Sequence, residues 1–329
     1  MNGILCVYKE AGYTSHDVIN RLRRISNQRK IGHTGTLDPN AEGVLPVCFG
    51  NATKVCGLLT DTDKVYCAEL ILGKATDTYD ITGEVISETE AHVTGEQLQE
   101  AIKTFIGTQM QTPPMFSARK VNGQKLYDLA RQGIVVEREQ KEITVFDISL
   151  DSFFSRNENG DTELEIKKDK YDKALLRKEV IRAYITVHCS KGTYIRSICH
   201  DIGEKLGCGA CMGSLLRTKV GRFTVEDSRK IKELAELSEE GKFEELLISA
   251  DSMFPDYPKI QQLPEEADVL LRNGNQIYLK QIPKYEWMEQ DKVQLRMYDG
   301  SGRFCAIYEY RKDKRYLQPV TMFPEYNGK

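Results

Sequence analysis

Apolar and polar residues alternate along several short stretches of the chain. Partial alternation runs through residues 65–72, 142–150 and 183–189, and residues 3–8 form a short apolar run. Alternation with a period of two is typical of a half-buried strand, and a short apolar run is typical of a buried strand. We therefore predict strands at these four places.

Apolar residues at helical spacing predict helices in other parts of the chain. Thr14 has an acidic residue three positions later, which is typical of a helix N-cap. Val18, Leu22 and Ile25 then fall on one face of this helix, and its arginines fall on the other. Strand and helix patterns do not alternate regularly, so they favour an α+β fold with a mixed, largely antiparallel sheet over a doubly wound parallel sheet. The other predicted helices are at residues 96–106, 124–132, 194–206 and 228–247.

The character of the sequence changes near residue 250. Prolines at 255, 258 and 264 indicate a linker, which we place at residues 251–264. Beyond it, an alternating stretch reaches the turn signal Asp-Gly-Ser-Gly at 299–302 and continues into a second apolar stretch, as in a β-hairpin. We therefore expect a large domain over residues 1–250 and a small β-rich domain over residues 265–329.

Composition and cysteine content indicate an ordinary globular protein. Hydrophobic residues make up 40% and charged residues 29% of the 329 positions. No apolar run approaches the roughly 20 residues needed to cross a bilayer, and the N-terminus lacks the features of a signal peptide, so we expect a cytoplasmic protein. The nine cysteines are then expected to be reduced thiols. Cys208 and Cys211 form a single CxxC, and because no second pair exists we do not expect a metal site.

Positive charge is concentrated locally although the formal net charge is −3. Residues 18–32 contain five basic residues and no acidic residue, and Arg217, Lys219 and Arg222 form a second cluster. Such local basic surfaces suit a partner that is held through a limited number of phosphates. Charge alone leaves a solvated helix face as an equal alternative.

The stretch GHTGTLDPNAEGVL at residues 32–45 is the most informative part of the sequence. It places one carboxylate, Asp38, between two glycine-bearing turns, and Pro39 restricts the backbone before it. Glycines allow a ligand to approach the backbone closely. An isolated loop of this kind is more often a surface turn capped by its aspartate. Here, however, several distant segments point to the same family.

Residues 32–55 (GHTGTLDPNAEGVLPVCFGNATKV) resemble the catalytic motif of the TruB-type tRNA pseudouridine synthases. The resemblance covers nearly the full chain and implies the pseudouridine synthase fold, followed by a compact PUA-like domain at residues 265–329. Three positions depart from the usual pattern, since Glu10, Phe116 and Cys211 stand where the family usually has Pro, Tyr and His. The other matching segments, in order, are KEAGYTSHDV (9–18), DKVYCAELILGKATDTYDITGEV (63–85), TPPMFSARKVNGQKLYDLARQGIVVER (112–138), CSKGTYIRSICHDIGEKLGCGA (189–210) and SLLRTKVGRF (214–223).

The resemblance implies a role for each candidate site residue. Asp38 matches the nucleophile, Arg196 its ion-pair partner, and Tyr66 the tyrosine that stacks on the target base and assists proton removal. His33 matches the histidine that fills the gap left by the extruded base. The substrate-binding residues implied are His33, Lys64, Tyr66, Tyr194 and Leu215. Phosphate contacts are expected from Arg21, Arg23, Arg24, Arg119, Lys120, Arg217 and Lys219.

The implied substrate is the T-arm stem–loop of tRNA, with the uridine at position 55 as its target. RNA loops are recognised through their shape and their splayed bases, which suits this substrate. The implied reaction has no net redox change and needs no group donor, so we expect no cofactor and no metal. We also expect a monomer that acts without an obligatory protein partner.

Other interpretations stay open at the level of the sequence. They are a non-catalytic RNA-binding protein with the same fold, a relative that modifies rRNA or snoRNA-guided sites, and an Asp-nucleophile hydrolase or nucleotidyl enzyme. The last would need an acidic metal-binding cluster, and near the loop only Asp38 and Glu42 are present. The charged insert at residues 155–179 is expected to be a solvated hairpin extension, with an extra tRNA contact as the alternative. Whether the nucleophile attacks the ribose C1′ or the base is also open.

Overall fold

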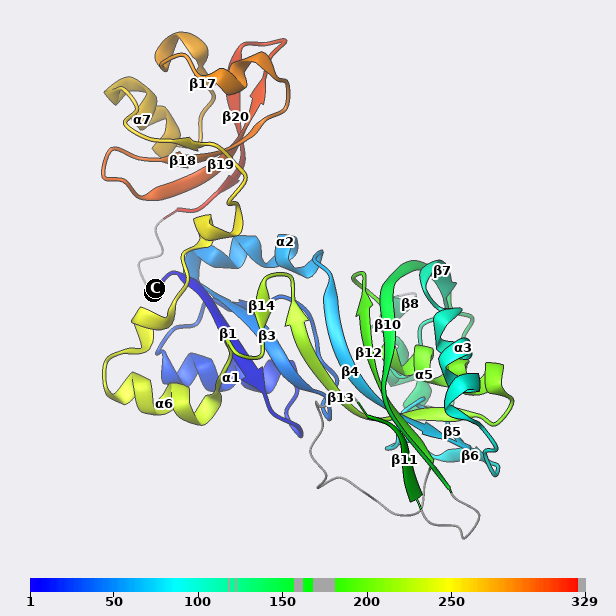
Figure 1. Cartoon of the computed structure of the whole chain (residues 1–329). Coiled ribbons are helices and arrows are strands. Elements are labelled where there is room, and N and C mark those ends of the chain that lie inside the picture. The colour runs from blue at the N-terminus through cyan, green and yellow to red at the C-terminus, as the bar shows by residue number, and fades with distance from the viewer. Residues whose placement is uncertain (118, 122, 157–161, 168–180, 325–329) are drawn as a thin grey trace.

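Two β-sheets of different size dominate the chain (Figure 1). The computed structural model describes residues 1–117, 119–121, 123–156, 162–167 and 181–324. In this part of the chain the large sheet has 11 strands, in the order β11-β10-β12-β4-β13-β3-β1-β15 with β2, β7 and β14 attached beside this path. The small sheet has five strands, in the order β16-β18-β19-β20-β17.

The strands of the large sheet confirm the predicted mixed, largely antiparallel arrangement. Among its described pairs, only β1 with β15 and β13 with β3 are parallel. The four predicted strands are present as β1, β4, β10 and β12. The bounds are β1 (Gly3–Lys9), β2 (Ile31–His33), β3 (Glu42–Phe49), β4 (Lys64–Leu72), β7 (Gly107–Gln111), β10 (Lys141–Arg156), β11 (Thr162–Lys167), β12 (Arg182–Cys189), β13 (Ala210–Val220), β14 (Phe223–Thr224) and β15 (Arg229–Lys230). Two short hairpins lie outside the sheet, β5 (Lys74–Thr76) with β6 (Val85–Glu88) and β8 (Lys120–Val121) with β9 (Gln124–Lys125).

The first helix begins where the sequence predicts it. The Thr14 hydroxyl accepts from the Asp17 N–H at 3.1 Å, and the Asp17 carboxylate accepts from the Thr14 N–H at 2.9 Å, which closes a capping box. Val18 and Leu22 are buried, as expected for the apolar face. The helices of the described residues are α1 (Ser15–Ile25), α2 (Cys56–Thr60), α3 (Gly95–Lys103), α4 (Leu126–Arg131), α5 (Ile195–Leu206), α6 (Ile231–Glu239) and α7 (Glu265–Arg272), with 3-10 turns η1 (Gly50–Val55), η3 (Phe243–Leu246), η4 (Ala250–Met253), η5 (Leu279–Gln281) and η6 (Glu286–Glu289).

The helix predicted over residues 228–247 is too long. Gly241 has a φ of 73°, and the Lys242 N–H donates back to the Leu237 carbonyl at 2.9 Å. Glycine in the left-handed conformation is a common helix terminator, because it has no Cβ to clash. The helix therefore ends at Glu239, and the chain continues into η3.

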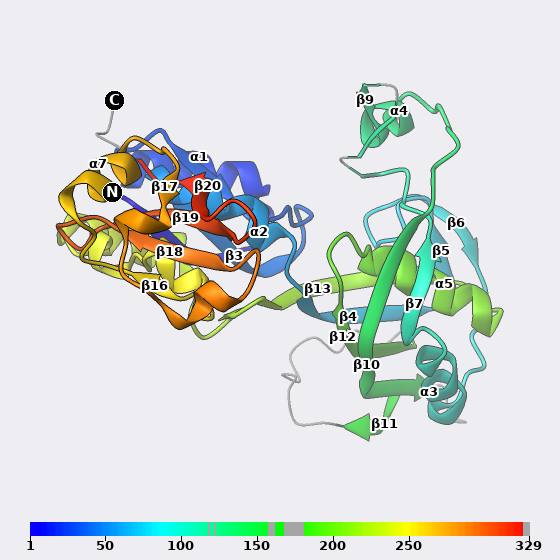
Figure 2. The same cartoon turned by 90° about the horizontal axis from the view of Figure 1, so that it is seen from above.

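Helices cover the large sheet at two ends. The α3 and α5 helices pack on the β10–β12–β4 end, where residues such as Leu98, Ile198 and Val187 form one apolar cluster. The α1 and α6 helices pack by β1 and β3 in a second cluster. Figure 2 shows α4 and β9 projecting away from the sheet. The middle strands β4, β13 and β3 lie between these two packed ends, and there the candidate site forms.

The small sheet contains the predicted hairpin. The β18 (Gln294–Tyr298) and β19 (Phe304–Arg311) strands pair antiparallel across the turn, and β17 (Ile277–Tyr278) and β20 (Tyr316–Met322) follow on one side. The remaining strand, β16 (Lys259–Ile260), pairs parallel to β18. It lies inside the range expected for a linker, so the small sheet takes up chain earlier than the proline pattern indicated.

The two sheets share apolar packing. Ile307 and Phe323 from the small sheet region belong to the same buried cluster as Ile4 and Val44 from the large sheet. The Tyr298 hydroxyl also donates to Asp251 Oδ2 at 2.5 Å. The connection between the sheets is therefore packed against both of them.

Part of the charged insert belongs to an antiparallel strand pair. Residues 152–156 of β10 pair antiparallel with residues 162–167 of β11, while residues 157–161 and 168–180 lie outside the described residues. All nine cysteines are free. Within the described ranges, no helix is long and apolar enough to cross a membrane, and no group of three or more His, Cys, Asp or Glu side chains is placed to hold a metal ion.

Candidate active site

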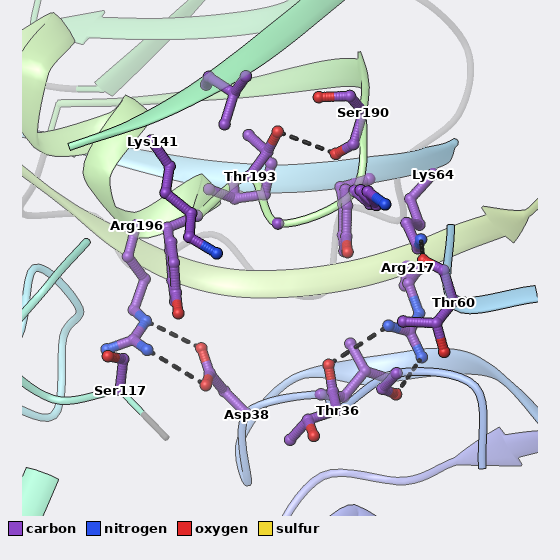
Figure 3. A pocket seen from close by; sticks show the side chains of 18 of the residues that line it. Thr36, Asp38, Thr60, Lys64, Ser117, Lys141, Ser190, Thr193, Arg196 and Arg217 are labelled. Atoms are coloured by element: carbon purple, nitrogen blue, oxygen red, sulfur yellow. Dashed lines mark hydrogen bonds and ion pairs between the residues drawn. The ribbon is translucent and has the colours of Figure 1, made fainter. Parts of the chain in front are cut away.

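A cleft of about 790 Å³ opens where the loop after β2, the start of β4, the segment before α5 and the middle of β13 meet (Figure 3). Each of these segments comes from one of the motifs that the sequence singled out. The predicted site residues in the lining are Asp38, Lys64, Tyr66, Arg119, Tyr194, Arg196, Leu215 and Arg217.

Asp38 and Arg196 form a two-point ion pair in this cleft (Figure 3). Arg196 Nε lies 2.8 Å from Asp38 Oδ2, and Arg196 Nη2 lies 3.2 Å from Asp38 Oδ1. The Arg196 side chain is 5% exposed and the Asp38 side chain is 40% exposed. The buried guanidinium therefore fixes the direction of a carboxylate that still reaches the cleft.

Arg196 is held by three further groups that the sequence did not predict. Its Nη1 donates to the Thr78 carbonyl at 3.2 Å and lies 3.7 Å from Asp80 Oδ2. Its Nη2 also donates to the Phe116 carbonyl at 3.0 Å. A planar fork with five N–H groups can meet all these acceptors at once. Asp80 lies in a matched motif, but nothing in its spacing indicates that it faces Arg196.

Arg217 is a correction to the predicted phosphate contacts. Its side chain is buried, and Nε donates to the Val44 carbonyl at 2.8 Å. The two terminal nitrogens contact the carbonyls of Thr36 and Gly35 at 3.4 and 3.3 Å. The strand pairing places Arg217 beside Gly43 at the start of β3, so its guanidinium lies within reach of these carbonyls. Arg217 therefore braces the Asp38 loop and is not free to bind a phosphate.

Gly43 makes this close strand contact possible. Its φ is +107°, and a Cβ at this position would lie 2.2 Å from the Arg217 carbonyl oxygen. Any side chain would therefore force β3 and β13 apart. The glycine-rich motif thus serves the packing beneath Asp38 as well as the loop itself.

Lys9 braces the other side of the loop, and the sequence did not predict this. Its amine is fully buried and donates to the carbonyls of Pro39 at 2.9 Å, Ala41 at 2.6 Å and Glu10 at 3.2 Å. Burial lowers the pKa of Lys9 to about 8, while nearby carboxylates act in the opposite direction. The loop that carries Asp38 is therefore held by one buried cation on each side.

Tyr66 and Lys64 enter the cleft from β4. Burial raises the pKa of Tyr66, and Arg217 counteracts the shift, so the phenol is neutral at pH 7. Lys64 donates to the carbonyls of Thr60, at 2.7 Å, and of Thr62. Burial, and next the charge of Arg217, lowers the pKa of Lys64 to about 8. The ring of Tyr66 is therefore an uncharged part of the cleft lining.

Tyr194 precedes α5, and a side chain from β7 fixes it. The Tyr194 N–H donates to Gln111 Oε1 at 2.8 Å, and Gln111 Nε2 donates back to the Tyr194 carbonyl at 3.0 Å. Because no side chain caps this helix locally, Gln111 fixes its start two residues before Arg196. Leu215 lies on β13 opposite Ala68 and completes the apolar part of the lining.

His33 lies at the end of β2 and is not part of the cleft lining. Its Nδ1 accepts from the Gly35 N–H at 3.3 Å, and burial, followed by the charge of Arg217, lowers its pKa. The structure therefore places a neutral imidazole at the root of the Asp38 loop. Its role in filling a gap in the RNA stays a prediction.

The other predicted phosphate contacts are dispersed. Arg119 lines the cleft but is bound to Glu139, with Nη2 3.0 Å from Oε2. On α1, Arg21 lies over the Tyr13 ring at 4.3 Å, Arg23 donates to Asn20 Oδ1 at 3.0 Å, and Arg24 is exposed. Lys219 is half-buried on β13, and the side chain of Lys120 lies outside the described part of the structure. Their contacts with phosphates stay predictions.

Basic side chains outnumber acidic ones in the lining of the cleft, although the whole chain is slightly acidic. Six cations and two carboxylates belong to the lining, and Arg119, Lys191 and Arg196 also pair with carboxylates outside it. Lys141 and Lys191 are cleft residues that the sequence analysis missed, and Lys191 is paired with Asp61 at 2.7 Å. The cations are Lys64, Arg119, Lys141, Lys191, Arg196 and Arg217, and the carboxylates are Asp38 and Glu142.

The fold is similar to two solved structures. One is a chain of the Cbf5-Nop10-Gar1 complex, with a TM-score of 0.66 and 23% identity over 99% of this chain and 86% of that chain. The other is from an H/ACA RNP bound to a substrate RNA containing 2′-deoxyuridine, with a TM-score of 0.64, 20% identity, and 99% and 86% coverage. The large sheet therefore has the expected pseudouridine synthase fold.

Sequence comparison places the chain within a family. The sequence model described as TruB family pseudouridylate synthase, N-terminal domain, matches residues 23–195, and the one described as tRNA pseudouridylate synthase B C-terminal domain matches residues 196–254. The chain belongs to the TruB family of pseudouridylate synthases. It is 47% identical to tRNA pseudouridine synthase B of Lachnoclostridium phytofermentans, over 98% of this chain and 100% of the relative. It is 38% identical to that of Bacillus pumilus, with 96% of both chains covered.

Proposed function

We propose that this protein is an isomerase that converts uridine to pseudouridine in tRNA, at position 55 in the T loop. The observation that carries this proposal is the two-point pair of Arg196 with Asp38 in a cleft of about 790 Å³. Membership of the TruB family supports the reaction, and the printed names of the relatives support the tRNA substrate. The remaining assignments are those that the family resemblance implies.

In this proposal Asp38 is the nucleophile. The reaction breaks the bond between ribose C1′ and N1 of uracil and forms a bond from C1′ to C5, and the proton lost from C5 is balanced by one gained at N1. A carboxylate can add covalently and then leave, at the ribose C1′ or at the base. Arg196 would hold both carboxylate oxygens in a fixed direction, so the nucleophile would need no reorganisation when the substrate arrives.

The proposed substrate enters as a nucleotide flipped out of the T loop. Tyr66, Tyr194 and Leu215 would surround the uracil ring, and His33 would stack in its place within the RNA. Lys141 and Lys191 would meet phosphates at the opening of the cleft. The small C-terminal domain, residues 265–329 of the sequence, is proposed to be a PUA-like module that adds RNA contacts.

The test is an assay of the purified chain alone on an unmodified T-arm stem–loop, without added metal or partner proteins, followed by mapping of pseudouridine. The proposal predicts complete conversion of one uridine, the one that corresponds to position 55. Tight binding without conversion would instead support a non-catalytic RNA-binding protein. Conversion at another position would contradict the assigned target.

A further inference from the structure

A second side chain of α5 faces the turn that holds Arg196. Arg196 and His200 are four residues apart on this helix, so they lie on the same face. Arg196 contacts the Thr78 carbonyl and the Asp80 carboxylate, and the His200 ring stacks on the residue between them, Tyr79. The two rings have centroids 3.9 Å apart and planes 9° apart. One face of α5 therefore contacts three consecutive residues of the turn.

Tyr79 has a backbone conformation that needs support. Its φ is 63°, in the left-handed region that residues with a side chain rarely adopt. Such a conformation persists only where the surroundings impose it. The Tyr79 carbonyl accepts from the Met212 N–H at 2.9 Å, and the Tyr79 N–H donates to the Thr76 carbonyl at 3.2 Å. The ring of Tyr79 stacks on the ring of His200.

The same turn aims the carboxylate of Asp80. Asp80 Oδ1 accepts from the Thr82 N–H at 3.0 Å and from the Thr82 hydroxyl at 2.5 Å. The other oxygen, Oδ2, is the one near Arg196. A shift of the turn would therefore move two acceptors of Arg196 together, the Thr78 carbonyl and Asp80 Oδ2.

We propose that the Tyr79–His200 stack is a positioning element for Arg196 and, through Arg196, for Asp38. The inference rests on the proposed function, because its consequence is a rate of uridine conversion. Neither Tyr79 nor His200 belongs to the cleft lining, so both act through the turn and not on the substrate. They are positioning residues that fix the two acceptors on the far side of the guanidinium.

The face of the histidine ring carries this role. His200 Nδ1 is buried and has no hydrogen-bond partner among the described residues. A neutral aromatic ring of similar shape should therefore replace it, whereas a small side chain should not. His200→Ala and His200→Phe both remove the imidazole, but only His200→Phe keeps a ring that can stack on Tyr79.

The experiment measures single-turnover conversion of tRNA with enzyme in excess, together with the Kd for tRNA. His200→Ala should lower the rate by roughly 10-fold to 100-fold, because small displacements of a positioned group have effects of this size. His200→Phe should stay within about threefold of the wild type, and Kd should stay within about threefold in both variants. Phe146→Ala is the matched control, since it removes another aromatic contact with a histidine, the ring contact with His188 at 4.9 Å, and should leave the rate unchanged.

A double-variant cycle with Asp80→Asn separates positioning from general stability. If the stack acts through the turn, the rate loss of the double variant is smaller than the product of the two single losses. Multiplicative losses, a His200→Ala rate within threefold of wild type, or an equal loss in His200→Phe would overturn the inference. The same double-variant cycle can also be measured as shifts of the urea-unfolding midpoint, which do not depend on uridine conversion. Failure of the wild-type protein to convert uridine would therefore refute the proposed function. Non-additive shifts of the urea-unfolding midpoint would still support the link between the Tyr79–His200 stack and the turn, and additive shifts would overturn it.

Discussion

Arg196 Nε lies 2.8 Å from Asp38 Oδ2, although 158 positions separate the two residues in the sequence. The pair joins the start of α5 to the loop after β2, and these segments meet only because β4, β13 and β3 are neighbours in the large sheet. The cation is the buried partner, and the carboxylate is the exposed one. The fold therefore supplies a fixed cation and leaves the aspartate accessible.

Replacement of Arg196 by lysine should separate charge from geometry. A lysine ammonium keeps the positive charge but cannot contact both Asp38 oxygens together with the Thr78 and Phe116 carbonyls. Arg196→Lys should therefore lower the single-turnover rate by ~100-fold, with the Kd for tRNA changed by less than about threefold. A rate close to that of the wild type would show that the two-point contact is dispensable.

Loss of the Lys9 amine should destabilise the protein. Lys9→Met removes the donor to the carbonyls of Pro39, Ala41 and Glu10, and leaves buried acceptors without that partner. We expect the free energy of unfolding in urea to fall by about 1–3 kcal/mol. The exposed Lys54 provides the control, and Lys54→Met should change the free energy by less than about 0.5 kcal/mol. Equal effects of the two variants would contradict the bracing role.

The same lysine should leave a signature in the pH dependence of stability. Its pKa is lowered from 10.5 to about 8 in the folded protein. Between these values the unfolded chain binds more protons, so Lys9 makes the free energy of unfolding increase as the pH rises. The difference between wild type and Lys9→Met should therefore grow between pH 8 and pH 10. A difference that is constant or shrinks across this range would contradict the lowered pKa.

Local patterns predicted the elements, whereas the bracing of the site depends on contacts between distant segments. The α1 N-cap and the strands follow from residues that are neighbours in the sequence, and the Asp38–Arg196 pair followed from family motifs. The phosphate contact predicted for Arg217 was wrong. In a sequence, a cluster of positive charge looks the same whether its cations face phosphates or backbone carbonyls. Carbonyl acceptors are common to all residues, so the sequence carries no sign of where Lys9 or Arg217 would find them.

The exposed arginines of α1 provide a test of the RNA footprint. Arg21 and Arg24 are exposed and three residues apart, so they lie on one side of the helix. If both meet phosphates, Arg21→Ala combined with Arg24→Ala should weaken tRNA binding and reduce its salt dependence by about two charges. The rate at saturating enzyme should stay unchanged. Wild-type binding and salt slope in this variant would mean that the α1 face is solvated and that the RNA lies elsewhere.

The most direct test of the account is the single-turnover rate of Asp38→Asn on an unmodified T-arm stem–loop. The amide has the same shape but is a poor nucleophile, so conversion should fall at least ~1,000-fold. Binding of the stem–loop and the melting temperature should stay near their wild-type values. Mass spectrometry of the variant excludes deamidation back to aspartate. Conversion at a rate within tenfold of the wild type would contradict the assignment of Asp38 as the nucleophile.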